Sequence, residues 1–339
     1  MGDRLILCSV DMCNSTQGKS NIELKEADYQ RKLYQRLASK LVQNEMVFFS
    51  QLERHYRKGL MSPSKSPLFS RLFVIKNIGD EFWFSIEPDE DNPYDVANIL
   101  SSLYIAAASF RYDDLIVDEE ELTMEEELDW RKDSDFIRVP ITFKIYADLI
   151  YSFIDYSETR FETFNKFFHT MLYPDDKRTE SEVKALKALL FNQMNVFASE
   201  SVTNKPEKLR GFVRTDLFGF QVDHFFRFSK FASTGVFSIG DRLFQAANPH
   251  FLKQNNEPNI VSFQTGRPGA LGQFAVLTFS QQQQGKGVSS PYSIYYLIER
   301  HAINQIRHQN NQLKDTNIRN TYLLLRRLGA LRDIKRKRD

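Results

Sequence analysis

Short apolar runs alternate along the first half of the chain with longer segments whose apolar residues recur at helical spacing. The apolar runs predict strands, and they occupy three stretches: 4–12, 69–87 and 136–150. The helical spacing predicts amphipathic helices over 23–56 and 92–107. Strands and helices therefore alternate, which is typical of an α/β chain, or α+β sandwich, in which helices cover a mixed sheet.

The second half of the chain is predicted to add helices, a short strand and loops to this core. Helical periodicity marks 155–200, and an aromatic-rich helix is expected over 218–232 after a short strand at 211–217. Gly, Pro and Gln residues gather at 266–272 and again at 281–287, which predicts a loop at each place. The last forty or so residues are predicted to be helical.

We therefore expect two units along the chain. Residues 1–240 form the first unit, interrupted by a helical insert at about 151–208, and residues 241–339 form an extension that packs on it. The extension ends in a basic helix with the run Lys335–Arg338, whose cations suit a helix C-terminus. The acidic stretch 113–135 is expected to be a solvated loop or an exposed helix.

Two aspartates stand at the ends of predicted strands. Asp11 follows the apolar run Leu5–Val10, and Asp80 lies with Gly79 at the tip of the turn between the paired strands. A single aspartate in such a place is ordinarily a cap or a turn residue. Two carboxylates that project from adjacent strands can bind divalent metal ions through oxygen, and such ions suit phosphoryl chemistry on a nucleotide.

Composition narrows the class of protein and its surroundings. The 339 residues carry a formal net charge of +1, which argues against a protein built to bind nucleic acid. Cys8 and Cys13 are the only cysteines and offer neither a disulfide framework nor a zinc site, so a reducing cytoplasm is expected. No apolar stretch approaches the roughly 20 residues that span a bilayer. The start of the chain has no signal-peptide layout, so no membrane is expected as a partner.

Several familiar catalytic motifs fail on their spacing. Gln17–Ser20 ends like a phosphate-binding loop, but Cys13 stands where that motif needs its first glycine. The six histidines show no ligand spacing on one helix face, and the chain has no Gly-x-Ser-x-Gly elbow. We therefore expect neither a P-loop, nor a histidine metal site, nor a serine hydrolase.

Three segments together resemble class III nucleotidyl cyclases. Val10–Thr16 is similar to the first-strand motif of that family, and Ile75–Asp80 is similar to its second, with a lysine four residues before the second metal-binding aspartate. Asp216–Arg227 resembles the third motif, in which Asp, Gly, Asn and Arg follow one another. The matched core covers about residues 4–110, 136–150 and 210–240.

The resemblance implies a role for each matched residue. The implied metal ligands are the side chains of Asp11 and Asp80 and the backbone carbonyl of Met12, which would bind two Mg²⁺ or Mn²⁺ ions. The implied substrate-binding residues are Lys76 and Asp216 at the base, with Asn14, Ser15 and Thr16 in the first motif. The implied catalytic residues are Arg227, which neutralises charge on the phosphoryl oxygens, and Asp223.

Members of this family combine the metal ligands of one subunit with the arginine of another. This chain carries both sets, so the resemblance implies a head-to-tail homodimer with two shared sites. Two positions depart from the family pattern: Asp223 replaces an asparagine whose amide donates near the ribose, and Asn14 replaces a common glycine. An ionised aspartate only accepts hydrogen bonds and would repel the triphosphate, so the role of Asp223 is open.

The base is open between adenine and a pyrimidine. Lys76 as donor and Asp216 as acceptor fit adenine, cytosine and, in a shifted pose, uracil. A free-standing chain with a long insert resembles the bacterial Pycsar antiphage pyrimidine cyclases, which make cyclic UMP or cyclic CMP for a separate effector. Most of that group make cyclic UMP, so UTP is slightly favoured over CTP. An adenylate cyclase is the first alternative, and a catalytically degenerate nucleotide-binding domain, suggested by Asp223, is the second.

Overall fold

The structure of the chain is a computed structural model. The residues that it describes are 4–13, 20, 23, 27–58, 66–78, 80–109, 114–117, 137–140, 142–155, 217–250, 252–253, 260–264, 273–308 and 316–330.

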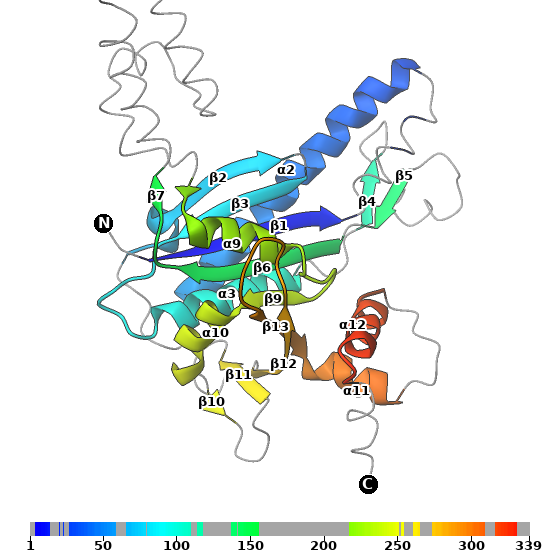
Figure 1. The fold of residues 1–339 in the computed structure, drawn as a ribbon. Coiled ribbons are helices and arrows are strands. Elements are labelled where there is room, and N and C mark those ends of the chain that lie inside the picture. The colour runs from blue at the N-terminus through cyan, green and yellow to red at the C-terminus, as the bar shows by residue number, and fades with distance from the viewer. Residues whose placement is uncertain are drawn as a thin grey trace, which may run out of the picture.

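A nine-stranded mixed sheet forms the centre of the molecule (Figure 1). Its strands follow the order β10-β11-β12-β13-β9-β6-β1-β3-β2. Neighbouring strands run antiparallel except β6 and β9, which are parallel. The strands are β1 Leu5–Cys13, β2 Leu72–Ile78, β3 Glu81–Ile86, β6 Thr142–Ile150, β9 Phe237–Gly240, β10 Leu252–Lys253, β11 Ile260–Gln264, β12 Gln273–Gln283 and β13 Tyr292–Glu299.

Helices cover both faces of this sheet. They are α2 Ala27–Arg57, α3 Asp95–Ser109, α9 Phe220–Ser229, α10 Asp241–Ala247, α11 Arg300–His308 and α12 Thr316–Arg327, with 3-10 turns at Leu68–Arg71 and Asn248–His250. One buried cluster joins α2, α3 and α10 to the sheet, and a second joins α9, α11 and α12 to it. Two ribbons stand apart from the large sheet: β4 Asp114–Val117 with β5 Ile137–Pro140, and β7 Ile154–Asp155 with β8 Leu217–Phe218.

Strand β1 lies in the interior of the sheet and is buried on both of its faces. Its side chains alternate, because successive residues of a strand point to opposite faces. The residues from Ile6 to Met12 with even numbers belong to the cluster of α2 and α3. Leu5 and Leu7 belong to the cluster of α9. Ser9 and Asp11 continue this second row, so the predicted metal ligand Asp11 faces the side of the sheet that α9 covers.

The predicted α/β class with a helix-flanked mixed sheet is confirmed. The prediction of a loop at 281–287 is wrong for 281–283, which belong to β12 because β13 pairs with them. The extension at 241–339 contains the expected helices, but it also supplies β10 to β13. These strands belong to the same nine-stranded sheet. The insert, beyond residue 155, and the basic tail lie outside the described residues.

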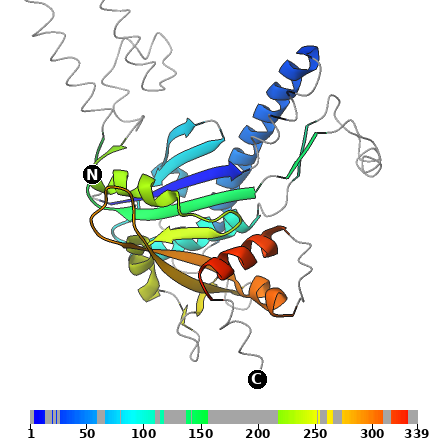
Figure 2. The same ribbon diagram turned by 45° about the vertical axis from the view of Figure 1, so that its right-hand side comes forward.

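The helices differ in how far they extend beyond the edge of the sheet. In Figures 1 and 2, α2 extends well past the edge of the sheet, whereas α11 and α12 lie beside β12 and β13. None of the helices within the described stretches is long and apolar enough to cross a membrane.

Candidate active site

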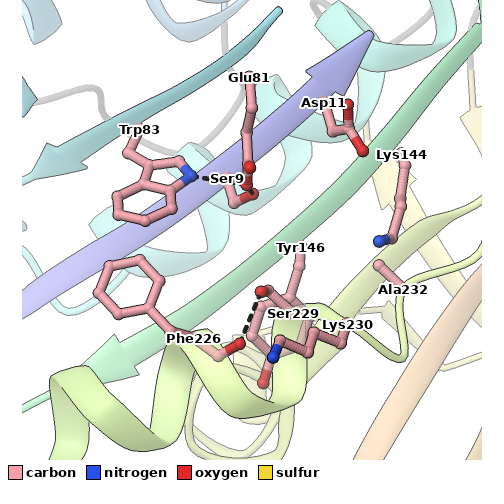
Figure 3. Close-up of a pocket in the computed structure, with 10 residues that line it drawn as sticks. All are labelled: Ser9, Asp11, Glu81, Trp83, Lys144, Tyr146, Phe226, Ser229, Lys230 and Ala232. Carbon is pink, nitrogen blue, oxygen red and sulfur yellow. Dashed lines mark hydrogen bonds between the residues drawn. The ribbon is translucent and has the colours of Figure 1, made fainter. Parts of the chain in front are cut away.

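A cavity of about 220 Å³ lies between the sheet and the C-terminal end of α9 (Figure 3). Strands β1, β3 and β6 form its floor. Its lining residues are Ser9, Asp11, Glu81, Trp83, Lys144, Tyr146, Phe226, Ser229, Lys230 and Ala232.

Two rows of side chains lie on the floor of the cavity, and each row consists of residues that stand opposite one another on β3, β1 and β6. In the first row, Asp11 on β1 stands opposite Glu81 on β3 and opposite Lys144 on β6. Directly opposed residues of antiparallel strands share a face, so the three ionisable groups lie side by side. This row places two carboxylates and one ammonium group at the same end of the sheet.

Asp11 sits in a crowded electrostatic environment. Burial raises the pKa of its carboxyl group, the negative charges of Glu81 and Asp80 raise it further, and Lys144 lowers it. The end of β1 also touches the turn that carries Asp80, because the backbone N–H of Met12 donates to the carbonyl oxygen of Asp80 at 3.2 Å. The structure therefore brings Asp11, Met12 and Asp80 to one place.

The donor chemistry at this place suits a hard divalent cation. Among the described residues, no three His, Cys, Asp or Glu side chains are grouped to hold a metal ion by themselves. Mg²⁺ is commonly bound through one or two carboxylates, with water and substrate phosphates completing its coordination. Asp11 and Asp80 match that arrangement, and the excess of negative charge around Asp11 is what a cation would relieve. Their role as ligands stays a prediction.

The second row of the floor fixes an aromatic side chain. Ser9 stands opposite Trp83 and Tyr146. Glu81 Oε1 accepts hydrogen bonds from Ser9 Oγ at 2.5 Å and from Trp83 Nε1 at 2.6 Å. The indole of Trp83 packs against Phe226 of α9, with the ring centroids 4.1 Å apart. Glu81 therefore orients Trp83, and Trp83 in turn supports the covering helix.

Lys76 lies beside the cavity and not in its lining. It stands opposite Trp83 in the pairing of β2 with β3. Its Nζ is 4.5 Å from the centroid of the Trp83 ring and 5.9 Å from that of Phe226. The predicted base-binding lysine thus contacts the two aromatic residues that wall the cavity.

Asp223 and Arg227 occupy the exposed side of α9. Together with Phe220 and Lys230 they follow helical spacing along one stripe, and all four are exposed. Arg227 Nη1 donates to the carbonyl oxygen of Lys286, in the turn between β12 and β13. Neither Asp223 nor Arg227 lines the cavity that contains Asp11. Within one chain, the structure does not bring these predicted catalytic residues together with the aspartates.

Four predicted substrate-binding residues fall outside the described part of the chain: Asn14, Ser15, Thr16 and Asp216. Sequence reasoning also missed the cavity residues Ser9, Glu81, Trp83, Lys144 and Lys230. The alternation of β1 gives Ser9 the same face as Asp11, which was a usable signal. The others depend on the register between strands that are far apart in the sequence.

A buried polar network holds α9 in place. The carboxylate of Asp148 on β6 accepts hydrogen bonds from Arg242 Nη2 at 2.6 Å and from the Tyr292 hydroxyl at 2.9 Å. Arg242 Nη2 also lies 3.4 Å from Nδ1 of His224, which is a buried residue of α9. Burial and the neighbouring positive charge of Arg242 lower the pKa of His224 to about 4. His224 is therefore neutral near pH 7 and packs as part of the core.

Comparison with known proteins found similarity only among solved structures, because the chain matches no protein-family model and no curated protein. The adenylyl cyclase CyaB from P. aeruginosa is 11% identical, with 87% of this chain and 93% of that chain covered and a TM-score of 0.39. The guanylate cyclase domain of RhGC from Catenaria anguillulae, in complex with GTP, is 9% identical, with coverage of 88% and 97% and a TM-score of 0.40. Similarity at this level does not by itself assign an activity.

Proposed function

We propose that this chain is a nucleotidyl cyclase, which converts a nucleoside triphosphate to the 3′,5′-cyclic mononucleotide and pyrophosphate. The observation that carries the proposal is the meeting of Asp11 and Asp80, joined through the Met12 N–H, beside a cavity lined by charged side chains. Carboxylates in such a place serve a reaction in which a nucleotide and divalent cations are bound together.

The proposed reaction forms one P–O bond and breaks another. The ribose 3′-oxygen attacks the α-phosphorus, its proton is lost, and the bond to the bridging oxygen of pyrophosphate breaks. Divalent ions, when bound, would favour ionisation of the 3′-hydroxyl and offset the charge of the triphosphate. In this proposal Asp11, Asp80 and the carbonyl of Met12 hold those ions, and Asn14, Ser15 and Thr16 lie next to the phosphates.

The remaining roles belong to a second copy of the chain. Arg227 points toward the turn between β12 and β13 of its own chain and does not line the cavity with Asp11. We infer that it serves the site of a partner in a head-to-tail homodimer, where it would neutralise the phosphoryl oxygens. Asp223, four residues before it on the same exposed stripe, would then face the partner as well.

The base is proposed to be a pyrimidine, with UTP slightly favoured over CTP. Lys76 as donor and Asp216 as acceptor would read the base. The product would act as a signal in antiphage defence, by activating a separate effector. Adenine is the alternative, because the same pair of residues also fits it. A second candidate is a domain that binds nucleotide without turnover, and the carboxylate of Asp223 in place of an amide is the observation that favours it.

The test is a turnover assay of the purified full chain with Mn²⁺ and each of ATP, GTP, CTP and UTP, with the products read by mass spectrometry. A cyclic nucleotide that disappears in Asp11→Asn supports the proposal. Asp91→Asn is the matched control, because Asp91 is an exposed aspartate in the loop after the far end of β3. Cyclic AMP as sole product would replace the pyrimidine assignment, and no product with any nucleotide would favour the binding-only domain.

A further inference from the structure

Strand β2 contains a β-bulge that determines to which face of the sheet Lys76 points. Val74 stands opposite Phe84 on β3, but the next aligned pair is Lys76 with Trp83, so Ile75 is an extra residue on β2. Without the bulge Ile75 would stand opposite Trp83, and alternation would direct Lys76 to the other face. Bulges next to active sites commonly re-aim a side chain in this way. The bulge therefore brings Lys76 to the face that α9 covers, where its Nζ approaches Trp83.

The bulge also completes a row of side chains across four strands. Lys76 stands opposite Trp83, Trp83 stands opposite Ser9, and Ser9 stands opposite Tyr146. Directly opposed residues share a face, so this row leads from the edge strand β2 into the cavity. Ser9, Trp83 and Tyr146 line the cavity, whereas Lys76 lies beside it. Within this row, Trp83 is therefore the residue that separates Lys76 from the interior of the cavity.

The indole ring of Trp83 is held in one orientation. Its Nε1–H donates to Glu81 Oε1 at 2.6 Å, and Ser9 Oγ donates to the same oxygen at 2.5 Å (Figure 3). Its ring also lies against Phe226, with the centroids 4.1 Å apart and the planes inclined by 30°. A hydrogen bond at the edge of the ring and an aromatic contact on its face restrict both its rotation and its tilt.

The ammonium group of Lys76 rests on this ring. Its Nζ is 4.5 Å from the centroid of Trp83, which is within the range of a cation–π interaction, and the residue is partly buried. A lysine side chain is otherwise a flexible four-carbon chain. Contact with a ring that is itself held by Glu81 therefore confines the ammonium group to a small region.

We propose that Trp83, held by Glu81, is a positioning residue that fixes the ammonium group of Lys76 at one distance from the base of the nucleotide. A fixed donor favours the base whose acceptor atom lies at that distance, and pyrimidine and purine rings place their acceptors differently. Discrimination between these two classes of base then depends on Trp83. The assignment of a base to Lys76 rests on the proposed cyclase function.

The first test measures the position of Lys76 in the full chain without nucleotide. Nuclear magnetic resonance follows the protons on Cε of Lys76, which are assigned by their loss in Lys76→Arg. Protons above an aromatic ring are shifted upfield, so these signals are expected to show such a shift. The shift is expected to vanish in Trp83→Leu and to decrease in Glu81→Ala. It is expected to remain in Glu81→Gln, because the amide oxygen still accepts from Nε1–H.

The second test measures the preference for a base. Calorimetric titration with Mn²⁺ gives the dissociation constants of 3′-deoxy-UTP and 3′-deoxy-ATP, which lack the attacking hydroxyl group and cannot be cyclised. Trp83→Leu is expected to bring the ratio of the two constants about fivefold closer to one, as the loss of a partly buried cation–π contact does. Trp83→Phe keeps a ring and retains most of the preference. Phe84→Leu is the matched control, because Phe84 is a buried aromatic residue of β3 on the opposite face, and it leaves the ratio unchanged.

Three results would overturn the positioning role of Trp83. These are an upfield shift that persists in Trp83→Leu, a preference that is unchanged in this variant while thermal melting shows it folded, or an equal change in Phe84→Leu. The cyclase proposal fails separately. A preference that depends on Trp83, without any cyclic product from the ordinary nucleotides, would keep the positioning role and reject the reaction. A cyclic product with a preference independent of Trp83 would keep the reaction and reject the positioning role.

Discussion

At the scale of single residues, the chemistry of the site is concentrated in Asp11. Its carboxyl group is partly buried, shares its surroundings with Asp80 and Glu81, and is only partly compensated by Lys144. Crowding of like charges is unfavourable for folding alone, so such an arrangement is typical of a functional site. A neutral residue of the same shape would relieve the repulsion and remove the oxygen donor at the same time.

We therefore predict that Asp11→Asn and Asp80→Asn separate activity from stability. Each change is expected to lower the rate of cyclic nucleotide formation at least about a hundredfold, because a charge-stabilising group is lost. The melting temperature of Asp11→Asn is expected to stay the same or rise, since repulsion by Glu81 and Asp80 ends. Product formation by mass spectrometry and thermal melting check the two parts. Full activity in either variant would contradict the assignment of metal ligands.

At the scale of elements, α9 is a helix with two separate tasks. Its inner face packs through buried Phe225, Phe228 and His224, and the polar network of Asp148 and Arg242 holds it to the sheet. Its outer stripe is exposed, and there Arg227 reaches the carbonyl oxygen of Lys286 in the turn between β12 and β13. The position of the exposed residues of α9 therefore depends on the packing of its buried face.

The contacts that hold the buried face of α9 are expected to make the stability of the protein depend on pH through His224. Its pKa is about 4 in the folded chain and about 6.5 when unfolded, so only the unfolded chain takes up its proton between these values. The free energy of unfolding must then fall as the pH drops through this window, by about 3 kcal/mol for His224. Urea unfolding of the unaltered chain and of His224→Phe at several pH values between 4 and 7 measures the difference.

In His224→Phe the ring contacts with Phe228 and Tyr292 are kept, whereas the titrating group is removed. The stability curve of this variant is therefore expected to be flatter than that of the unaltered chain. Arg242, Asp148 and Tyr292 face the same position in both proteins, so their contributions largely cancel. Two parallel curves would show that His224 is not held neutral by its surroundings.

A second prediction at this scale concerns the joint between β9 and α10. A Cβ atom added at Gly240 would come within 2.2 Å of the Asp148 side chain, which is fixed by Arg242, Tyr292 and Leu243. Gly240→Ala is therefore expected to lower the free energy of unfolding by about 3 kcal/mol or more, as overpacking of a rigid neighbour does. Urea unfolding measures it, and a loss below about 0.5 kcal/mol would mean that the network can move aside.

The sequence predicted the strands and the turn that carry the two aspartates, but it did not predict which other side chains line the cavity. The apolar run that ends at Asp11 and the turn that carries Asp80 were local signals, and their strands are found where expected. Lys144 could not be placed, because its position depends on the pairing of β1 with a strand more than 130 residues further along. The last three residues of β12, Gln281–Gln283, were mistaken for a loop, because glutamine has little intrinsic preference for strands and the pairing with β13 is not visible in the local sequence.

At the scale of the whole molecule, the proposed activity depends on two copies. Within one chain Arg227 does not line the cavity that contains Asp11, and a head-to-tail pair of chains would bring the two residues together twice. In such a dimer neither of the two active sites is complete when both chains carry the same inactivating substitution. One of the two sites is complete when one chain carries a substitution at an aspartate and the other chain carries a substitution at Arg227.

Mixing Asp80→Ala with Arg227→Ala chains is therefore expected to restore activity. Random pairing makes half of the dimers mixed, each with one complete site, so roughly one quarter of the original activity returns. Mixing Asp11→Ala with Asp80→Ala is the matched control, because each site then lacks one aspartate and no activity returns. The turnover of each mixture is measured, and mass determination verifies that mixed dimers have formed. Mixed dimers without recovery would reject the shared site.

The interior place of β1 in the sheet has a consequence for how the protein is made. Its partner in β3 lies some seventy residues later, and its partner in β6 about as far again. At ribosomal rates, β6 emerges on the order of ten seconds after β1. During that time one edge of an apolar strand is without its neighbour and open to pairing with other chains. Fragments that stop before Thr142 are therefore expected to aggregate, and the newborn chain to rely on chaperones until β6 has been synthesised.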